Sequence, residues 1–344
     1  MQELVLTGPG ELTWKERPAP TIEEPGQALV RPVAVSTCDF DHLMVKGEMP
    51  MPMPVAIGHE CVAEVVEVGA AVRKLRAGDL VVVPFQVACG ECGACRRGHT
   101  SNCERTSWLS GYGMGPLGGD FGGAMADLML VPYAEAMLVP LPEGVAPAEA
   151  AAAGCNVVDA YRCVGPQLAE RPGAGVLVVG GAFESIALYA VAIAKALGAG
   201  RVDYVDRDPR RRERAAALGA EPLDRLRVQP GAYPISVDAS LDPELLELAV
   251  RATAPDGVCT VSPMYTGSAT PLPLFDMFQR CVTLRTGQPH VRAHLETVLE
   301  LIAAGLLRHP ELAPPTVAWE EGASAFGGGE GKTVCLRDCH RRSH

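Results

Sequence analysis

Four cysteines in one short segment constrain the fold of this chain more than any other feature of its 344 residues. Two, two and seven residues separate them, and they are Cys89, Cys92, Cys95 and Cys103. Thiolates three positions apart on a tight loop can point at one centre, and the glycines between them give the loop the freedom this requires. Because a closed set of four cysteines is the usual cage for structural zinc, we expect a zinc lobe over residues 86–106. Free thiols or two disulfides are the alternatives.

Composition and charge limit the possible partners. The net charge of −11 argues against nucleic acid or an anionic membrane as the main partner. The first residues lack the basic start and apolar run of a signal peptide, and no segment has the unbroken apolar length of a membrane span. Twelve cysteines without an export signal indicate thiols used for metal rather than for disulfides, so we expect a cytoplasmic protein.

A second metal site is indicated by Cys38, His59 and Cys155. Two cysteines and one histidine make a three-ligand zinc site with an open position, which is the catalytic rather than the structural pattern. Taken alone, a cysteine is more often a small buried hydrophobe, and a histidine a hydrogen-bonded loop residue. Their occurrence together with the four-cysteine lobe favours the metal interpretation.

The two halves of the chain differ in their patterns. Apolar runs at residues 4–6, 28–35, 61–68 and 79–84 predict strands, so the first 135 residues or so are β-rich, with the cysteine lobe as a long insertion. Downstream, residues 175–206 read as strand, glycine turn, helix, strand and acid, which is the dinucleotide-binding unit. The pyrophosphate would lie at the helix N-terminus. Asp206 favours NAD over NADP because it repels a 2′-phosphate, whereas Arg207 weakens that preference.

Together these features resemble the zinc-containing medium-chain alcohol dehydrogenases over essentially the whole chain. The matching elements are Cys38, Gly58-His59-Glu60, Gly69, Gly78-Asp79, the cysteine lobe, Cys155, the nucleotide-binding half and the closing strand at 332–336. The resemblance implies Cys38, His59 and Cys155 as catalytic zinc ligands, and Glu60 as a nearby or alternate ligand. It also implies a homodimer or homotetramer with contacts at the edge of the parallel sheet.

The resemblance further implies two domains. A GroES-like β-rich catalytic domain would span residues 1–150 and 290–344, and a Rossmann-type doubly wound parallel-sheet domain residues 151–289, with substrate in the cleft between them. We expect sheet strands at 256–261 and 282–285, and a helix at 294–307 whose apolar stripe, ending at Leu306, is core. Phe40, Trp108, Tyr112 and Met114 are expected near the substrate cleft.

The glycine turn departs from the usual pattern, because a strict G-x-G-x-x-G is absent. Ala182 and Ala187 stand where glycines are usual, and Glu184 would bring a carboxylate near the phosphates. The expected cofactor-contacting residues are Gly180, Gly181, Ala182, Ser185, Asp206, Arg207 and, by resemblance, Arg211. Lys332 is either a further phosphate contact or a surface lysine.

A second departure concerns proton transfer. Two positions after the first ligand cysteine, the family commonly has a Ser or Thr whose hydroxyl starts a proton relay. This chain has Phe40 at that position, and phenylalanine carries no exchangeable proton. A histidine relay position falls at Leu43. The proton would need another path, for which the candidates are Asp39, Asp41, His42, Glu60 or water; for His42 a solvated helix position is the alternative.

We therefore expect a zinc-dependent oxidoreductase with one catalytic and one structural zinc, which transfers a hydride between NAD(P)(H), with NAD favoured, and a small alcohol or carbonyl substrate held on zinc. One alternative is the reduction of an imine or a conjugated alkene, which needs no hydroxyl relay. The other is a non-redox zinc protein with weakened cofactor binding. A nucleic-acid-binding zinc module is disfavoured by the acidic balance.

Overall fold

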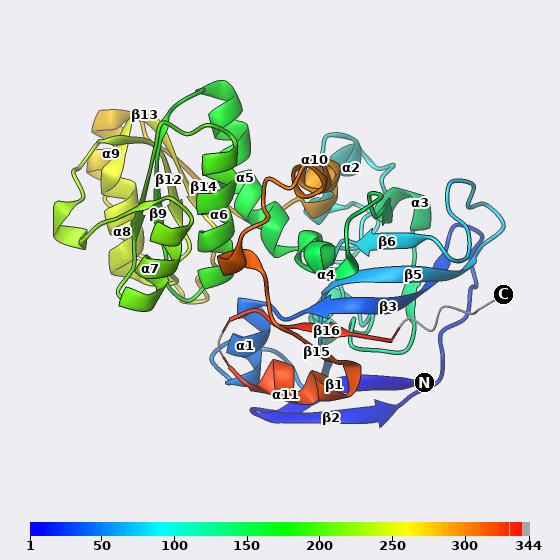
Figure 1. Ribbon diagram of the computed structural model, residues 1–344. Helices are drawn as coiled ribbons and strands as arrows, with labels where there is room; N and C mark the ends of the chain where they lie inside the picture. The colour runs from blue at the N-terminus through cyan, green and yellow to red at the C-terminus, as the bar shows by residue number, and fades with distance from the viewer. Residues whose placement is uncertain (330, 339–344) are drawn as a thin grey trace. The chain divides into compact units, whose positions relative to one another are not determined.

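The computed structural model describes residues 1–329 and 331–338, which form two compact units (Figure 1). Unit 1 comprises Met1–Val158, His290–Ala304 and Pro314–His344, and unit 2 comprises Asp159–Pro289 and Gly305–Ala313. The first boundary falls within helix α5 (Asn156–Glu170).

Unit 1 is built on a sheet with the order β15-β16-β3-β5-β6-β8, in which β7 also pairs with β3. A smaller sheet has the order β2-β1-β4. Apart from the parallel pair β15–β16, the strand pairs in these sheets are antiparallel, which confirms the predicted β-rich GroES-like unit. The strands are β1 (Gln2–Gly8), β2 (Glu11–Glu16), β3 (Ala28–Ser36), β4 (Val55–Ala56), β5 (Glu60–Val68), β6 (Leu80–Val83), β7 (Met129–Val131), β8 (Val139–Pro140), β15 (Thr316–Ala318) and β16 (Val334–Leu336).

The helices of unit 1 are short except for one. They are α1 (Asp39–Val45), α2 (Gly93–Arg96), α3 (Ala134–Met137), α4 (Pro147–Ala150), α10 (Val291–Ala303) and α11 (Gly322–Gly327). Helix α10 begins and ends earlier than the predicted helix at 294–307. Gly305, with φ of 71°, follows its end, so Leu306 lies outside the helix and is 49% exposed. The prediction that Leu306 belongs to the core was wrong, whereas Leu295 and its helical neighbours are buried.

Unit 2 contains a fully parallel sheet with the order β11-β10-β9-β12-β13-β14. This is the doubly wound order that reverses between its first and fourth strands, which confirms the predicted Rossmann-type unit. Helices α6, α7 and α8 pack against its strands (Figure 1). The strands are β9 (Gly175–Val179), β10 (Arg201–Val205), β11 (Glu221–Pro222), β12 (Tyr233–Asp238), β13 (Thr253–Val261) and β14 (Thr283–Thr286), and the helices are α6 (Glu184–Ala196), α7 (Pro209–Ala217), α8 (Pro243–Ala252) and α9 (Leu274–Arg280).

Local sequence signals fix the ends of the helices in unit 2. Helices α7 and α8 both start with an Asp-Pro pair, in which Asp208 or Asp242 accepts backbone N–H groups of the first turn. Helix α6 is buried along most of its length and ends before Gly198, whose φ of 78° allows the Schellman turn. These signals place the carboxyl ends of β9, β10 and β12 beside the N-termini of their following helices, where this class of fold binds ligands.

Candidate functional site

The four cysteines of the lobe form one cluster. The Sγ atoms of Cys89, Cys92, Cys95 and Cys103 all lie within 4.8 Å of one another. Backbone N–H groups point at these sulfur atoms, as in the 3.4 Å contacts from Cys92 to Cys89 and from Cys95 to Cys92. Hydrogen bonds from the N–H groups of Glu104 and Cys95 lower the pKa of Cys92 to about 6. The cysteines are free rather than paired, so the donor set suits a metal that binds thiolates.

A second cluster joins Cys38, His59, Glu60 and Cys155, whose ligand atoms also lie within 4.8 Å of one another. All four residues are buried. Cys38 follows β3 and caps α1, while Glu60 opens β5. Ser36 on β3 pairs with Glu60, which brings the two segments together. Two thiols, one imidazole and one carboxylate are donors that zinc accepts, so the residues present fit a zinc ion.

Cys155 reaches this cluster because of the glycine before it. A Cβ atom at Gly154 would lie 2.4 Å from the carbonyl oxygen of Val83 on β6. The chain therefore passes so close to the sheet that no side chain fits at this position.

Asp41 orients His59. The Nδ1 atom of His59 lies 3.2 Å from Oδ1 of Asp41, but the angles are not those of a hydrogen bond, so the contact is electrostatic. The other oxygen of Asp41 accepts the N–H of Cys38 at 2.9 Å. Burial lowers the pKa of His59, but the charges of Asp41 and Cys38 raise it well above its ordinary value. With Nδ1 turned to Asp41, Nε2 is left for a metal.

Glu60 and Lys332 form a buried ion pair. The Nζ atom of Lys332 lies 2.6 Å from Oε2 of Glu60 and also donates to the carbonyl oxygen of Thr37 at 2.6 Å. Its side chain is 8% exposed, so the expectation of a surface lysine was wrong. Burial raises the pKa of Glu60 to about 8, against the lowering effect of Lys332.

Asn156 was missed by the sequence analysis. Its backbone N–H donates to Oε1 of Glu60 at 2.7 Å, and its Nδ2 donates to Sγ of Cys38 at 3.1 Å. Nδ2 also lies 3.9 Å from Sγ of Cys155. Its position directly after a predicted ligand was the only signal in the sequence.

The residues considered for proton transfer are buried rather than solvated. His42 is 7% exposed, and its Nε2 lies 3.0 Å from the carbonyl oxygen of Gly331, so the solvated helix position was wrong. Asp39 and Phe40 are also buried. The ring of Phe40 stands edge-on to His59 at 6.3 Å. An apolar ring therefore stands where the resemblance would lead one to expect the hydroxyl of a Ser or Thr.

One of the expected cleft residues, Tyr112, belongs to the core instead. Tyr112 is fully buried, and its hydroxyl donates to the carbonyl oxygen of Leu130 at 2.8 Å, so it is a core residue. Trp108 is 73% exposed. Met114 is half-buried.

In unit 2 the glycine turn packs tightly in spite of its altered pattern. A Cβ atom at Gly181 would lie 2.5 Å from the carbonyl oxygen of Ser240, and one at Gly180 would lie 2.0 Å from the hydroxyl of Tyr204. The N–H of Ala182 donates to Ser240, and Ala187 is buried inside α6. Both glycines are therefore required by close approach, and the turn is held by the segment after β12.

Asp206 closes β10 beneath this turn. Its two oxygens accept the hydroxyl of Tyr204 at 3.0 Å and the N–H of Asp208 at 2.9 Å. Burial raises its pKa. A carboxylate oxygen has two lone pairs, so Asp206 can still accept further hydrogen bonds.

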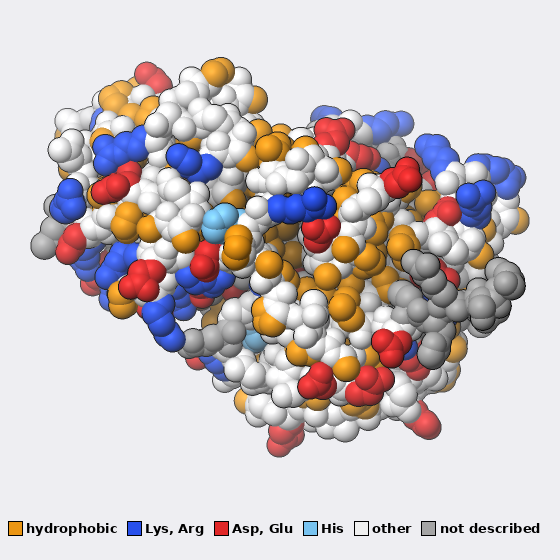
Figure 2. Space-filling view, viewed as in Figure 1, with side chains coloured by type: hydrophobic (Ala, Val, Ile, Leu, Met, Phe, Trp, Pro, Cys, Tyr) orange, Lys and Arg blue, Asp and Glu red, His pale blue; other side chains and the backbone are white. Residues whose placement is uncertain are grey.

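The arginines beside Asp206 are held by carboxylates. Arg207 lies 2.8 Å from Asp242 and 3.0 Å from Glu244. Arg211 lies 3.2 Å from Glu184 and 3.8 Å from Asp206. The charge that Glu184 brings to the start of α6 is thereby neutralised. In Figure 2, Lys and Arg side chains alternate with Asp and Glu over the region of α7 and α8.

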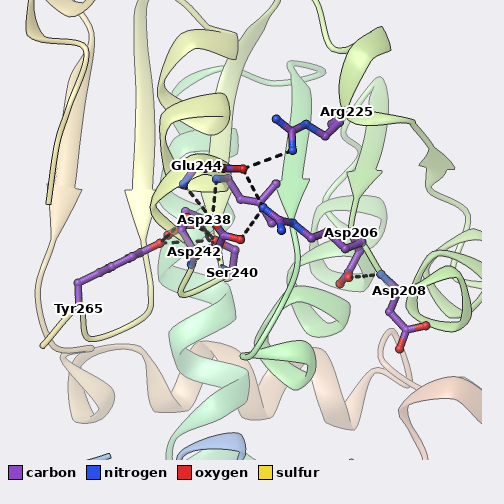
Figure 3. Close-up of polar contacts among 10 residues, drawn as sticks. Asp206, Asp208, Arg225, Asp238, Ser240, Asp242, Glu244 and Tyr265 are labelled. Atoms are coloured by element: carbon purple, nitrogen blue, oxygen red, sulfur yellow. Dashed lines mark hydrogen bonds and ion pairs between the residues drawn. The ribbon is translucent and has the colours of Figure 1, made fainter. Parts of the chain in front are cut away.

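A further buried carboxylate lies at the end of β12 (Figure 3). Asp238 accepts hydrogen bonds from the hydroxyls of Ser240 at 2.5 Å and Tyr265 at 2.9 Å. Burial raises its pKa to about 6, although these hydrogen bonds oppose the shift. The sequence analysis did not single out this carboxylate.

The family model described as "Alcohol dehydrogenase GroES-like domain" matches residues 24–143. The chain is 29% identical over 351 residues to a probable zinc-binding alcohol dehydrogenase of Mycobacterium tuberculosis, with 98% of this chain and 88% of that protein covered. It is 33% identical over 240 residues to a glutathione-independent formaldehyde dehydrogenase of Pseudomonas aeruginosa, with 64% of this chain and 58% of that protein covered.

Among solved structures, the alcohol dehydrogenase TADH from Thermus sp. ATN1 superimposes with a TM-score of 0.88. It is 31% identical, and the match covers 98% of this chain and 100% of that one.

Proposed function

Because the chain belongs to the zinc-containing medium-chain alcohol dehydrogenase family and is therefore an oxidoreductase, we propose that it transfers a hydride between NAD(H) and a small alcohol or carbonyl substrate. The observation that carries this proposal is the buried cluster of two thiols, one imidazole and one carboxylate within 4.8 Å. The comparisons do not favour the two alternatives, imine or alkene reduction and a non-redox zinc protein.

Cys38, His59 and Cys155 are the proposed ligands of a catalytic zinc, with Glu60 as a nearby or alternate ligand. Bound zinc would supply Lewis-acid polarisation of the substrate oxygen. Asp41 fixes the ring of His59, a role that such outer partners of a ligand histidine commonly have. The four lobe cysteines are the proposed cage of a second, structural zinc.

Proton transfer must avoid Phe40, which has no exchangeable proton. Of the candidates, Asp41 is held by Cys38 and His59, and His42 by Gly331. Glu60 belongs to the ligand cluster itself, and its Oε2 atom lies 2.6 Å from Nζ of Lys332. We propose Oε2 of Glu60, with Lys332 as its partner, as the site that exchanges the proton.

The proposed cofactor-contacting residues are Gly180, Gly181, Ala182, Ser185, Asp206, Arg207 and Arg211. NAD rather than NADP is favoured, because a 2′-phosphate would approach the carboxylate of Asp206. Arg207, which could have met that phosphate, is already paired with Asp242 and Glu244. Figure 3 shows Asp206 together with the acidic groups that follow β12.

We also propose a homodimer or homotetramer that uses the edge of the parallel sheet. Strand β14 is the last strand on one side and is largely exposed. Helix α9, directly before it, carries Phe275 at 70% and Phe278 at 82% exposure. Large apolar side chains gathered beside an open strand edge are typical of a protein interface.

A cytoplasmic location is proposed because thiol ligands need reducing surroundings. The described cysteines are all free, in agreement with such surroundings. No helix in the described part of the chain is long and apolar enough to cross a membrane.

The first experiment is a zinc count on Cys155→Ala. Elemental analysis should find two zinc ions per wild-type chain and about one in the variant, which keeps the lobe ion. The rate of NADH-dependent reduction of a panel of small aldehydes and ketones should fall at least 1,000-fold. A Lewis acid stabilises the transition state by several kcal/mol, and losing it slows the reaction by roughly this factor. Cys163→Ala, at a buried cysteine outside both clusters, should change neither readout. A Cys155→Ala protein with both metals and full activity would show that the site is assigned wrongly.

A further inference from the structure

We propose that Asn156 is a positioning residue of the catalytic metal site. It holds Cys38 and Glu60 in the arrangement that receives the ion. The inference rests on the proposed function, because it concerns the same cluster. It assigns a role to a residue that is itself no ligand.

The contacts of Asn156 reach three of the four residues of the cluster. Its side-chain Nδ2 donates to Sγ of Cys38 at 3.1 Å and lies 3.9 Å from Sγ of Cys155. Its backbone N–H donates to Oε1 of Glu60 at 2.7 Å. Asn156 opens α5, and the first N–H groups of a helix have no partner within it, so this donor is free to hold Glu60.

The orientation of the amide follows from chemistry. Were it reversed, the carbonyl oxygen would face the sulfur of Cys38, and two acceptors would meet once that sulfur binds a metal as a thiolate. The N–H donor must therefore point at the thiolate. A donor in this position fixes the sulfur of Cys38 within the cluster through a hydrogen bond of 3.1 Å.

The carbonyl oxygen of the Asn156 side chain indicates that this amide does not serve to stabilise the fold. Asn156 is 1% exposed, and its Oδ1 has no hydrogen-bond partner among the described residues. A buried acceptor without a partner is unfavourable, so an apolar residue of the same size would suit the fold at least as well. The amide is therefore explained by the ligands that it holds.

The test is the rate at which zinc passes to the chelating dye 4-(2-pyridylazo)resorcinol. Wild-type protein should release its two ions in two phases, and the phase that Cys155→Ala removes belongs to the catalytic site. In Asn156→Leu this phase should be about 10- to 100-fold faster, the usual cost of losing an outer partner of a metal ligand. The lobe phase should be unchanged. The Tm of the metal-free variant should equal or exceed that of the metal-free wild type, a result that a merely structural role would not give.

Gln167→Leu is the matched control. Gln167 is also a buried amide with an unpartnered oxygen, but it bonds to Arg162 and Thr260, away from both cysteine clusters. This variant should leave both phases unchanged. Asn156→Ala repeats the test with a smaller side chain in case leucine is not accommodated.

The inference is overturned by release at the wild-type rate in both Asn156 variants, or by equal acceleration in Gln167→Leu. Loss of the lobe zinc in both Asn156 variants would also overturn it, because it would make Asn156 a general structural residue. If the wild-type protein lacked the zinc-release phase that Cys155→Ala is expected to remove, the proposed function itself would be contradicted. Failure of the inference and failure of the proposed function are therefore distinguishable.

Discussion

At the scale of single residues, the proposed preference for NAD over NADP depends on the charges around Asp206. Arg211 and Arg214 both bind the carboxylate of Glu184, and Arg214 also binds Glu311 at 2.9 Å. Both guanidinium groups are thus occupied by carboxylates, and Arg211 also lies 3.8 Å from Asp206, the proposed ribose contact. An incoming 2′-phosphate would have to compete with carboxylates that are already in place.

Glu184→Gln should therefore raise the affinity for NADPH about tenfold, because a freed guanidinium can form a charge-assisted bond worth about 1.5 kcal/mol or more. The Kd of NADH should change less than threefold, since its ribose hydroxyls carry no charge. Titration calorimetry of both cofactors on the zinc-loaded protein measures the two values. Wild-type protein should bind NADH more tightly than NADPH.

Glu247→Gln is the control for this change. It removes one carboxylate from an exposed pair with Arg251 in the same unit and should alter neither Kd. Equal gains for both cofactors in Glu184→Gln would contradict the selectivity argument. If the wild type bound neither cofactor at millimolar concentration, hydride transfer itself would be excluded.

At the scale of elements, the turn between β9 and α6 depends on one close approach. Gly181 passes the backbone of Ser240 so closely that a Cβ atom would lie 2.6 Å from its Cα atom. Neither partner can retreat cheaply, because both belong to the main chain. The altered glycine pattern thus keeps the glycine that packing requires.

Gly181→Ala should destabilise unit 2 by roughly 1–3 kcal/mol, the usual cost of overpacking, and should weaken NADH binding at least tenfold. Gly175→Ala is the control, because a Cβ atom there has open space. Urea unfolding and NADH titration measure the two effects. An unchanged urea midpoint in Gly181→Ala would mean that the segment after β12 can move away.

Sequence periodicity predicted the elements well, but it could not predict contacts between distant segments. The strands predicted within residues 175–206 became β9 and β10, whereas α7 and α8 with their Asp-Pro starts were not predicted. The ion pair between Lys332 and Glu60 spans 272 positions, and only the pairing of β16 with β3 and of β3 with β5 brings the two together. The proposed ligands could be predicted from their residue types and from the resemblance, and they lie together in the structure, whereas Asn156 has no motif of its own.

At the scale of the whole molecule, the parallel sheet ends on one side at an uncovered strand. The main-chain groups on the outer side of β14 pair with no other strand in the described part of the chain. Phe275 and Phe278 stand out from α9, which two residues separate from β14. Burying each ring between two copies would contribute about 1.5–3 kcal/mol.

The double variant Phe275→Asp, Phe278→Asp should therefore weaken self-association at least 100-fold, because the four buried rings of a symmetric interface, two from each copy, become four charged side chains. Sedimentation velocity over a range of protein concentrations measures this, with a dimer or tetramer expected for the wild type and a smaller species for the variant. Leu306→Asp, at an exposed leucine outside α9 and β14, should associate as the wild type does. The zinc content should remain two per chain, because both metal clusters lie in unit 1 and these rings in unit 2. An unchanged oligomer in the double variant would locate the interface elsewhere on the molecule.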